Sequence, residues 1–569
     1  MKNLLRLVVA LLFTPASQAA SPPPVGAENG MVVTAQQYAT RTGVDVLKQG
    51  GTAMDAAVAV GYALAVVYPA AGNLGGGGFM TAQFADGRKT FIDFREVAPL
   101  AATANMYLDA QGNVITDLST RGYLAVAVPG TVSGLEYVRE KYGSMPRAQL
   151  IGPAIKLAEE GFVLDQGDVD ILHEGTDDFR KDAPSAAIFL AGNEPLEAGA
   201  RLVQKELGRT LRNISRSGVN GFYKGATASA LLASSRAGKG ILTQADFDAY
   251  QTRELSPVEC DYRGFHIVAA PPPSSGGIAL CEILNVLEGY PLASYGFGSA
   301  HAVHFEIEAM RHAYVDRNNL LGDPAFVRNP VEQLLDKNYA KQIRASIDPL
   351  RAGNSGTLKP GIAATEGTHT THYSIADRFG NAVAVTYTLN DWFGARVMPA
   401  GTGVLLNDEM DDFTAKVGVA NMYGLVQGEA NKIEPGKRPL SSMTPTIVTR
   451  DGKPWMIVGT PGGSRIITAV MLTMLNVIDY GMDLQEAVAA PRIHQQWQPE
   501  TTFVEDRALS PDTLRILAGM GHKLSVPQPE NHVAAILIGA PALNAPPVGR
   551  NRFYGAIDPR RATGLALGY

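Results

Sequence analysis

The sequence predicts a mixed α/β (α+β) protein in which two stacked antiparallel sheets lie between layers of helices, a four-layer αββα sandwich. Three observations carry this prediction. Helical and strand patterns follow one another near the N-terminus, and helical patterns dominate from about residue 135 to 350. After residue 370 come two hairpin patterns and then a helix. Helices packed on the outer faces of two stacked sheets accommodate this order.

Composition sets the broad class of the chain. With 569 residues, 46% hydrophobic and 18% charged, it can bury a large core. The 60 glycines and 35 prolines are spread through it, and no low-complexity linker divides it. A net charge of -6 without a basic stripe argues against nucleic acid as a partner.

Residues 1–20 have the pattern of a secretory signal peptide. Basic residues flank the start of the short apolar run 7–13, and small residues lead to an expected cleavage after Ala19 or Ala20. That run is too short to cross a bilayer, and no later stretch approaches eighteen uninterrupted apolar residues. We therefore expect a soluble protein without a membrane span, secreted or, in a Gram-negative bacterium, periplasmic.

The first predicted elements are two helices and a hairpin. The helical patterns cover residues 35–48 and 55–67 and end at glycine and proline signals. The glycine run 75–78 predicts a loop too rich in glycine for regular structure, followed by strands near 79–84 and 90–94. The run lacks the Lys-Ser/Thr of a P-loop, so it does not indicate nucleotide binding.

The helix-dominated middle of the chain includes a long helix over residues 300–321 and both cysteines. Cys260 begins a probable strand, and Cys281 lies in the helical run 278–287. An oxidising compartment would allow the two to pair. Their placement on a strand and on a helix favours two buried thiols instead.

Beyond residue 350 the pattern changes. Residues 351–369 are polar and rich in structure breakers, as expected of a processing loop. A hairpin over 370–376 and 382–388 follows, then a second hairpin that turns at 451–452 and a helix over 464–479.

Residues 370–374 (TTHYS) and 461–465 (PGGSR) together suggest a concealed N-terminal nucleophile. A hydroxyl on a chain's first residue carries its own base, because the adjacent α-amine has a pKa of about 7.7–8.0. Thr370 gains that amine only if the bond after His369 is cut, plausibly by its own attack on the carbonyl behind it. Taken alone, the pentad is more often a β-strand with a hydroxyl-bearing face.

Several segments, in order and spacing, make the chain resemble the γ-glutamyltransferase (glutathione hydrolase) family from about residue 34 to 569. These are 72–79 (GNLGGGGF), 93–96 (DFRE), 370–374, 381–390 (NAVAVTYTLN), 406–413 (LNDEMDDF), 438–443 (RPLSSM) and 461–465. The resemblance implies the αββα sandwich of N-terminal nucleophile hydrolases. It also implies a precursor that cuts itself into a large subunit, 21–369, and a small catalytic subunit, 370–569, which stay together as a heterodimer.

The same resemblance assigns roles around Thr370. Thr388 would support the nucleophile through a hydroxyl hydrogen bond, and the backbone amides of Gly462 and Gly463 would hold the developing oxyanion. Read without the family, Thr388 is a good strand residue, and the glycine pair is a turn needed only for its geometry.

A γ-glutamyl group ends in an α-amine and an α-carboxylate, so its pocket needs both signs of charge. The residues that match the family's binding positions are Arg95, Ser441 and Ser442 for the carboxylate and Asn390, Glu409 and Asp412 for the ammonium. Without the family, the acidic run 408–412 is more often a solvated turn or a loose cation site. It lacks the pattern of an EF-hand.

Two stretches concern access to that pocket. Residues 416–427 look like the family's lid loop, with Tyr423 as the residue that closes the pocket on small substrates. Asp391 and Trp392 stand where many bacterial relatives carry small hydroxyl residues, which puts acceptor preference and the shape of the pocket mouth in doubt. Glu409 replaces a glutamine found in some relatives and should tighten ammonium binding.

We expect neither metal nor cofactor. His369 and His372 would point to opposite faces of a strand, and no His-Glu-x-x-His motif occurs. The hypothesis is thus an exported enzyme whose Thr370 takes the γ-glutamyl group from glutathione or similar amides and passes it to water or to amino acids and peptides. The nearest alternative is a cephalosporin or glutaryl acylase with the same nucleophile. A periplasmic amino-acid-binding protein without catalysis is a third.

Overall fold

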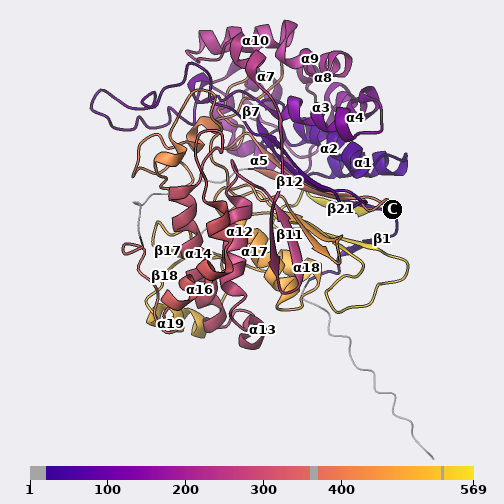
Figure 1. The fold of residues 1–569 in the computed structure, drawn as a ribbon. Helices are drawn as coiled ribbons and strands as arrows, with labels where there is room; N and C mark the ends of the chain where they lie inside the picture. The colour runs from indigo at the N-terminus through magenta and orange to yellow at the C-terminus, as the bar shows by residue number, and fades with distance from the viewer. Residues whose placement is uncertain (1–20, 359–369, 527–530) are drawn as a thin grey trace, which may run out of the picture.

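The computed structural model describes residues 21–358, 370–526 and 531–569 (Figure 1). Two predicted segments lie outside the described residues: the signal peptide 1–20, and residues 359–369 of the processing loop, which include His369.

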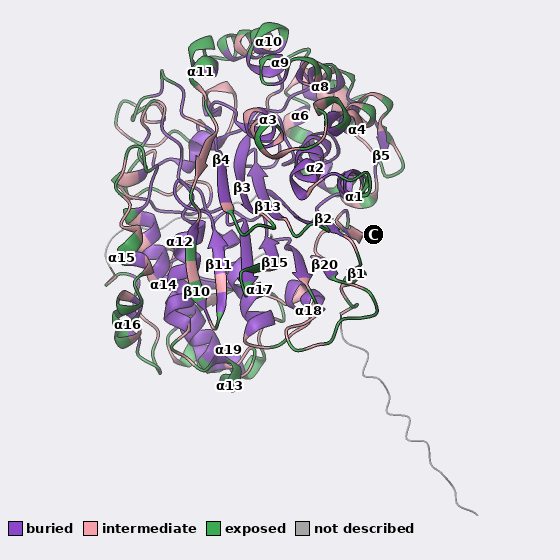
Figure 2. Ribbon diagram, turned by 45° about the vertical axis from the view of Figure 1, so that its right-hand side comes forward, coloured by how far each residue is buried: buried purple, intermediate pink, exposed green. Residues whose placement is uncertain are grey.

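Within the described residues, two seven-stranded sheets form the centre of the molecule, and every strand pair in them is antiparallel (Figure 2). Sheet I has the order β1 (Val25–Ala27), β20 (Phe553–Ile557), β19 (Ala534–Ile538), β15 (Lys453–Gly459), β14 (Thr446–Arg450), β11 (Phe265–Ala269) and β10 (Val258–Tyr262). Sheet II has the order β21 (Leu565–Gly568), β2 (Met31–Thr34), β12 (Thr371–Ala376), β13 (Ala382–Thr388), β3 (Gly77–Gln83), β4 (Lys89–Phe94) and β9 (Arg253–Leu255).

A small apolar core joins the two sheets face to face. It contains Val33 and Ala384 from sheet II and Ile457 and Ile536 from sheet I, all buried. Alternation along each strand sends one set of side chains into this core and the other toward the helices.

Helices cover the two outer faces. The layer on sheet II contains α1 (Gln37–Lys48), α2 (Ala53–Val67), α3 (Thr131–Tyr142), α4 (Arg147–Glu160), α5 (Gln166–Glu174), α6 (Thr176–Phe179), α7 (Ala183–Phe189), α8 (Lys205–Ser217), α9 (Asn220–Tyr223), α10 (Gly225–Ala237) and α11 (Gln244–Ala249). The layer on sheet I contains α12 (Gly276–Leu287), α13 (Leu292–Tyr295), α14 (Ala300–Leu320), α15 (Val331–Leu335), α16 (Lys337–Ser346), α17 (Arg465–Ile478), α18 (Leu484–Ala489) and α19 (Pro511–Gly519). The predicted αββα sandwich is confirmed.

Small strands and 3₁₀ turns complete the fold. The strands are β5 (Phe162–Val163), β6 (Leu190–Ala191), β7 (Glu194–Pro195), β8 (Arg201–Leu202), β16 (Ile493–His494), β17 (Thr501–Val504) and β18 (Lys523–Ser525). The 3₁₀ turns are η1 (Tyr123–Ala125), η2 (Glu409–Asp412) and η3 (Glu429–Asn431). Among the described residues, no helix combines the length and the apolarity needed to cross a membrane.

One predicted loop is partly wrong. Gly77 and Gly78 belong to β3 rather than to the glycine-rich loop before it. A Cβ at Gly78 would collide with β13 at Thr386 and Tyr387, and one at Gly76 would collide with the Thr388 carbonyl. Glycine here permits close approach of β3 to β13 rather than a flexible loop.

The hairpin that follows Thr370 lies inside sheet II. β12 pairs with β2, Tyr373 opposite Thr34, and β13 pairs with β3, Thr388 opposite Gly77. The pair β12–β13, which follows residue 370, is therefore inserted between β2 and β3, which precede it, in one hydrogen-bonded sheet.

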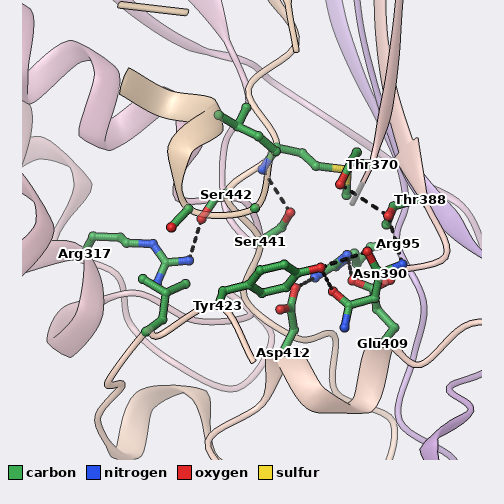
Figure 3. Close-up of a pocket in the computed structure, with 15 residues that line it drawn as sticks. Arg95, Arg317, Thr370, Thr388, Asn390, Glu409, Asp412, Tyr423, Ser441 and Ser442 are labelled. Carbon is green, nitrogen blue, oxygen red and sulfur yellow. Dashed lines mark hydrogen bonds and ion pairs between the residues drawn. The ribbon is translucent and has the colours of Figure 1, made fainter. Parts of the chain in front are cut away.

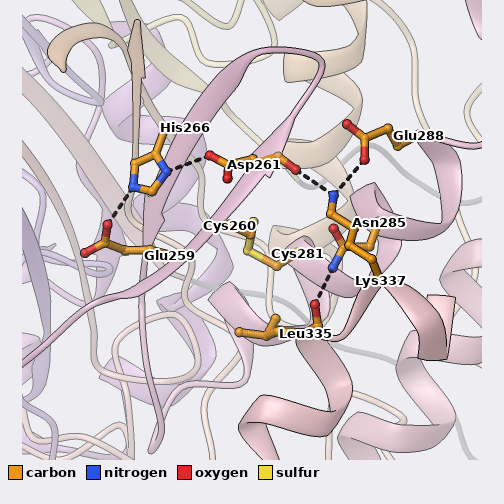
Figure 4. Close-up of a disulfide and its surroundings, with 9 residues drawn as sticks. All are labelled: Glu259, Cys260, Asp261, His266, Cys281, Asn285, Glu288, Leu335 and Lys337. Atoms are coloured by element: carbon orange, nitrogen blue, oxygen red, sulfur yellow. Dashed lines mark hydrogen bonds and ion pairs between the residues drawn. A yellow bond between two sulfur atoms is a disulfide. The ribbon is translucent and has the colours of Figure 1, made fainter. Parts of the chain in front are cut away.

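The cysteines form a disulfide, so the prediction of two buried thiols is wrong. Cys260 lies on β10 at the edge of sheet I, and α12 packs against that strand with Cys281 facing it (Figure 4). The two Cα atoms are 6.0 Å apart, a separation that a disulfide requires. The contact between strand and helix that creates this separation is tertiary and is not visible in the spacing of the two residues.

Replacing Cys260 and Cys281 together by serine is expected to lower the free energy of unfolding by about 3 kcal/mol, because the disulfide restricts a loop of 21 residues in the unfolded chain. Urea denaturation of the double variant measures the loss. Wild-type protein unfolded in the presence of a reductant is the control and should lose a similar amount. Equal stability of oxidised wild type and double variant would contradict a stabilising disulfide.

Candidate active site

Thr370 and Thr388 face each other at the ends of the two central strands of sheet II. The register of the hairpin pairs Thr371 with Tyr387, which sets Thr370 opposite Thr388. The Thr388 hydroxyl donates to Thr370 Oγ1 at 3.3 Å and accepts from the Asn390 backbone N–H at 2.9 Å (Figure 3). Thr370 is 4% exposed, so its hydroxyl is oriented in a largely buried position.

The glycine pair forms the turn between β15 and α17. Gly462 and Gly463 have φ values of 131° and 51°, where residues with a Cβ are strained. A Cβ on Gly462 would collide with the Asn531 side chain, and one on Gly463 would lie 2.5 Å from the Tyr423 ring. Neither backbone N–H donates to another described residue. Two backbone donors at the start of a helix are therefore available for an anion.

Arg95 lies directly after β4 and is held by two carboxylates. Glu409 and Asp412 stand three residues apart on the 3₁₀ turn η2, where such side chains share one face, and each bonds one terminal nitrogen of Arg95. Although burial opposes its charge, Glu409 and Asp412 raise the pKa of Arg95 above its ordinary value. The positive and negative groups predicted for the two ends of a substrate thus pair with each other in this structure.

Glu96 is a buried carboxylate that the sequence did not single out. Its carboxylate lies 3.7 Å from Arg95, behind the pair with Glu409. Burial raises the pKa of Glu96 to about 7 and also raises the pKa of Glu409. With three acidic side chains around one guanidinium, a further cation at this end of the pocket would favour the charged forms of the carboxyl groups.

Asn390 and Tyr423 close one side of the site. The Tyr423 hydroxyl contacts both the backbone and the side-chain oxygen of Asn390, at 2.8 Å for the backbone. The Asn390 amide nitrogen donates to the Asp408 carbonyl at 3.0 Å. Tyr423 is buried and its ring covers Gly463, which is the position expected of a residue that closes the pocket.

Ser441 and Ser442 lie on a segment that is held by hydrogen bonds from residues outside the predicted motifs. The Ser441 N–H donates to the Pro273 carbonyl at 2.9 Å, and Arg317 of α14 donates to Ser442 Oγ at 2.8 Å. Arg317 was not predicted as a site residue. Within the helical pattern of 300–321 nothing distinguishes it from an arginine on a helix surface.

One cavity of about 290 Å³ collects these side chains. It is lined by Arg95, Arg317, Thr370, Thr388, Asn390, Glu409, Asp412, Tyr423, Leu425, Ser441, Ser442, Met443, Gly463, Ser464 and Ile466. Every predicted site residue except Gly462 lines it, and Gly462 precedes Gly463 in the same turn.

Asp391 and Trp392 do not line the cavity. Asp391 pairs with Arg396 at 2.8 Å and with Arg121 at 3.3 Å. The Trp392 ring packs edge-on against Tyr68 and under the Arg561 guanidinium. The two residues that differ from the common family pattern therefore form ion pairs and aromatic contacts beside the cavity.

The histidines considered for metal binding do not face the cavity. His372 is buried, bonded to Thr386 at 2.8 Å and Ser374 at 3.1 Å, and burial lowers its pKa to about 3. His369 lies outside the described residues.

A separate cluster of His304, Glu308 and His522 lies near the start of α14. His304 Nε2 donates to the Asp348 carbonyl, so its Nδ1 accepts from His522 at 2.8 Å. Arg311 neutralises Glu308. A His–His hydrogen bond therefore accounts for the cluster, about 20 Å along α14 from Arg317.

The chain is similar to known proteins along nearly its whole length. The family model described as gamma-glutamyltranspeptidase matches residues 39–568. A glutathione hydrolase proenzyme from Pseudomonas sp. (strain A14) is 70% identical over 97% of this chain and 96% of its own length. One from Escherichia coli (strain K12) is 47% identical over 96% and 93%. The crystal structure of a cephalosporin acylase from Bacillus halodurans superposes with a TM-score of 0.82 at 27% identity, covering 98% of this chain and 99% of that one.

Proposed function

The chain belongs to the γ-glutamyltranspeptidase family of self-processed N-terminal nucleophile hydrolases, and from that premise we propose that Thr370 is its nucleophile in glutathione hydrolysis and γ-glutamyl transfer. The observation that carries the assignment is the common cavity of Thr370, its hydrogen-bonded partner Thr388 and the charged cluster around Arg95. A hydroxyl nucleophile beside both signs of charge suits an acyl group with a zwitterionic end.

Maturation precedes turnover in this proposal. Residues 1–20 direct export and are then removed, and a cut before Thr370 divides the chain into a large subunit, 21–369, and a small subunit, 370–569. The signal-like N-terminus and the Cys260–Cys281 disulfide support a periplasmic or secreted location, because disulfides persist in oxidising compartments. The freed α-amine of Thr370 is then the base that the threonine lacked.

In the first half-reaction, Thr370 Oγ1 attacks the γ-carbonyl carbon of the substrate while the α-amine takes the hydroxyl proton. The N–H groups of Gly462 and Gly463 stabilise the oxyanion, and one such donor contributes about 2.7–4 kcal/mol to lowering a barrier. The carbon–nitrogen amide bond breaks, and the leaving amine takes the proton. In the second half-reaction, water or an acceptor amine attacks the Thr370 ester and releases the γ-glutamyl group.

To bind the zwitterionic end of the substrate, Arg95 and its partners Glu409 and Asp412 must also form ion pairs with the substrate. Its α-carboxylate binds Arg95, Ser441 and Ser442. Its ammonium binds Glu409 and Asp412, with Asn390 at the same end. The ammonium favours the charged forms of the buried carboxyl groups, so a ligand with both charges fits better than one with either alone.

The similarity to a cephalosporin acylase makes a glutaryl acylase the alternative to test. A glutaryl group has the carboxylate but no ammonium, so it would leave Glu409 and Asp412 without a new partner. We expect kcat/KM for γ-glutamyl-p-nitroanilide to exceed that for glutaryl-p-nitroanilide by at least ~100-fold. Faster release of p-nitroaniline from the glutaryl compound would instead support an acylase.

The cut itself is tested on the purified, signal-free protein. A denaturing gel should show two bands, and N-terminal sequencing of the smaller should begin at Thr370. An amino-acid-binding protein without catalysis would give a single band and release no p-nitroaniline. A single-band protein that nevertheless turns over substrate would overturn the role of Thr370 as a terminal nucleophile.

A further inference from the structure

Arg317 is a buried arginine of the pocket wall whose donors reach only neutral groups. It is 1% exposed and lines the cavity. Its guanidinium donates to Ser275 Oγ at 3.0 Å and to Ser442 Oγ at 2.8 Å, and Figure 3 shows it pointing at Ser442. Its other hydrogen bonds reach the side-chain oxygens of Asn318 at 2.9 Å and Gln427 at 3.5 Å.

In the described part of the chain, the charge of Arg317 has no carboxylate in direct contact. Among the described residues no carboxylate oxygen lies within 4.0 Å of its guanidinium, whereas Arg95, Arg311 and Arg438 each have one. Burial lowers the pKa of Arg317 to about 10, so the group is still a cation at neutral pH. A buried, unpaired cation is costly unless an anion joins it.

The hydrogen bonds also fix what the two serines can offer. A guanidinium can only donate, so Ser442 Oγ accepts from Arg317 and keeps its own hydrogen for another partner. Ser441 Oγ likewise accepts, from the Met443 N–H at 3.1 Å. Neither hydroxyl has an acceptor among the described residues, and both line the cavity. The pocket wall thus presents two O–H donors, the arrangement that a carboxylate needs.

Arg317 also anchors the backbone that carries these serines. Ser275 Oγ accepts from Arg317 Nε and donates to the Ser441 carbonyl at 2.6 Å. The Ser275 N–H donates to the same carbonyl at 2.8 Å. One guanidinium therefore orients the Ser442 side chain directly and the Ser441 main chain through Ser275.

We propose that Arg317 is a positioning residue that turns Ser442 into a hydrogen-bond donor for the substrate's α-carboxylate, and that this carboxylate supplies Arg317 with a negative charge that no described carboxylate supplies by direct contact. The inference rests on the proposed function and adds to it a specificity determinant outside the predicted motifs. Arg95 already forms ion pairs with Glu409 and Asp412, whereas Arg317 forms none with a described carboxylate. A substrate carboxylate can therefore pair with Arg317 without breaking an existing ion pair.

The test compares three p-nitroanilides on wild type and Arg317→Met. The γ-glutamyl compound has both the α-carboxylate and the ammonium, the 4-aminobutyryl compound has only the ammonium, and the glutaryl compound has only the carboxylate. We expect kcat/KM to fall about 10- to 100-fold for the two carboxylate-bearing compounds, mainly through KM, the range for losing a hydrogen bond to a charged group. For the 4-aminobutyryl compound we expect a change of less than about 3-fold.

Three controls separate positioning from general damage. Arg317→Lys keeps the charge and should recover part of the loss. Arg311→Met removes another buried arginine of α14, one paired with Glu308, and should leave the ratio between the three substrates unchanged. Arg317→Met combined with Ser442→Ala should cost no more than the larger single change, because both act on one carboxylate contact.

Each outcome either supports or overturns the proposed role of Arg317. Loss confined to the carboxylate-bearing compounds supports the inference. Equal losses on all three compounds, or no loss, overturn it while leaving the proposed function intact. Competitive inhibition by L-glutamate, 4-aminobutyrate and glutarate gives the same comparison for binding where turnover of one anilide is too slow. A wild-type protein that releases p-nitroaniline from none of the three overturns the proposed function, and the inference with it.

Discussion

Replacing Thr370 by alanine is expected to leave the purified chain uncut before residue 370 and to reduce turnover of γ-glutamyl-p-nitroanilide on the order of 10⁴-fold or more. Alanine has no hydroxyl to attack either the preceding carbonyl or the substrate, so both reactions fail together. Thr388 cannot substitute, because it reaches Thr370 Oγ1 only as a hydrogen-bond partner at 3.3 Å. A denaturing gel and an anilide assay on the same preparation measure both effects.

Thr370→Ser is the matched control for this change. It keeps the hydroxyl and, once cut, the α-amine beside it, so it should still yield two subunits and measurable activity. An Arg95 variant that is cut but poorly active would show in addition that the two losses can be separated. A Thr370→Ala protein that is both cut and active would refute the assignment of the nucleophile.

Replacing Arg95 by methionine is expected to lower kcat/KM for γ-glutamyl-p-nitroanilide about 10²- to 10³-fold, because the substrate carboxylate loses a buried charged partner. The same change should lower the free energy of unfolding by about 3–5 kcal/mol near pH 8, since Glu409 and Asp412 lose the cation between them. Arg95→Lys should recover stability more than activity, because an ammonium cannot bond both carboxylates in the geometry of a guanidinium.

The stability loss should depend on pH with a defined sign. Burial raises the pKa of Glu96 to about 7, above its ordinary 4.5, and removing the Arg95 charge raises it further. The folded protein then binds more protons than the unfolded chain, so stability falls as pH rises from about 4.5 through the folded pKa. Urea denaturation at pH 5 and pH 8 should give a smaller difference between variant and wild type at pH 5. A difference independent of pH would show that the buried carboxylates are not responsible.

The elements around Thr370 were predictable from local pattern. The strand Ala382–Thr388 has the bounds expected from its alternation, and the hairpin at 451–452 and the helix of Arg465–Ile478 lie where turn and helix signals put them. Gly77 and Gly78 were misjudged because their role is to let two strands approach, which depends on the neighbour β13. The disulfide was missed for the same reason, since it depends on how α12 packs on β10.

The same distinction holds for the site: the motifs predicted which residues belong to it but not which of them contact one another. The predicted residues share one cavity because motif resemblance locates residues of known spacing, whatever their mutual contacts. Motif resemblance could not reveal that Arg95 binds Glu409 and Asp412, since the three-dimensional arrangement decides which charges pair. Arg317 lies in no predicted motif, and Glu96, although part of the motif 93–96, was given no role. Their importance comes from burial and from the partners that they have or lack.

The order of sheet II also governs how the two products of a cut before Thr370 would behave. β12 and β13 come from one side of that residue, and their neighbours β2 and β3 come from the other. Two independently folded halves could not dock like ordinary subunits, since each would lack the middle or the flanks of one continuous ladder. If the two halves were expressed from separate genes, they would have to fold together to form this sheet. Exchange of a half between two folded molecules would require both molecules to unfold first.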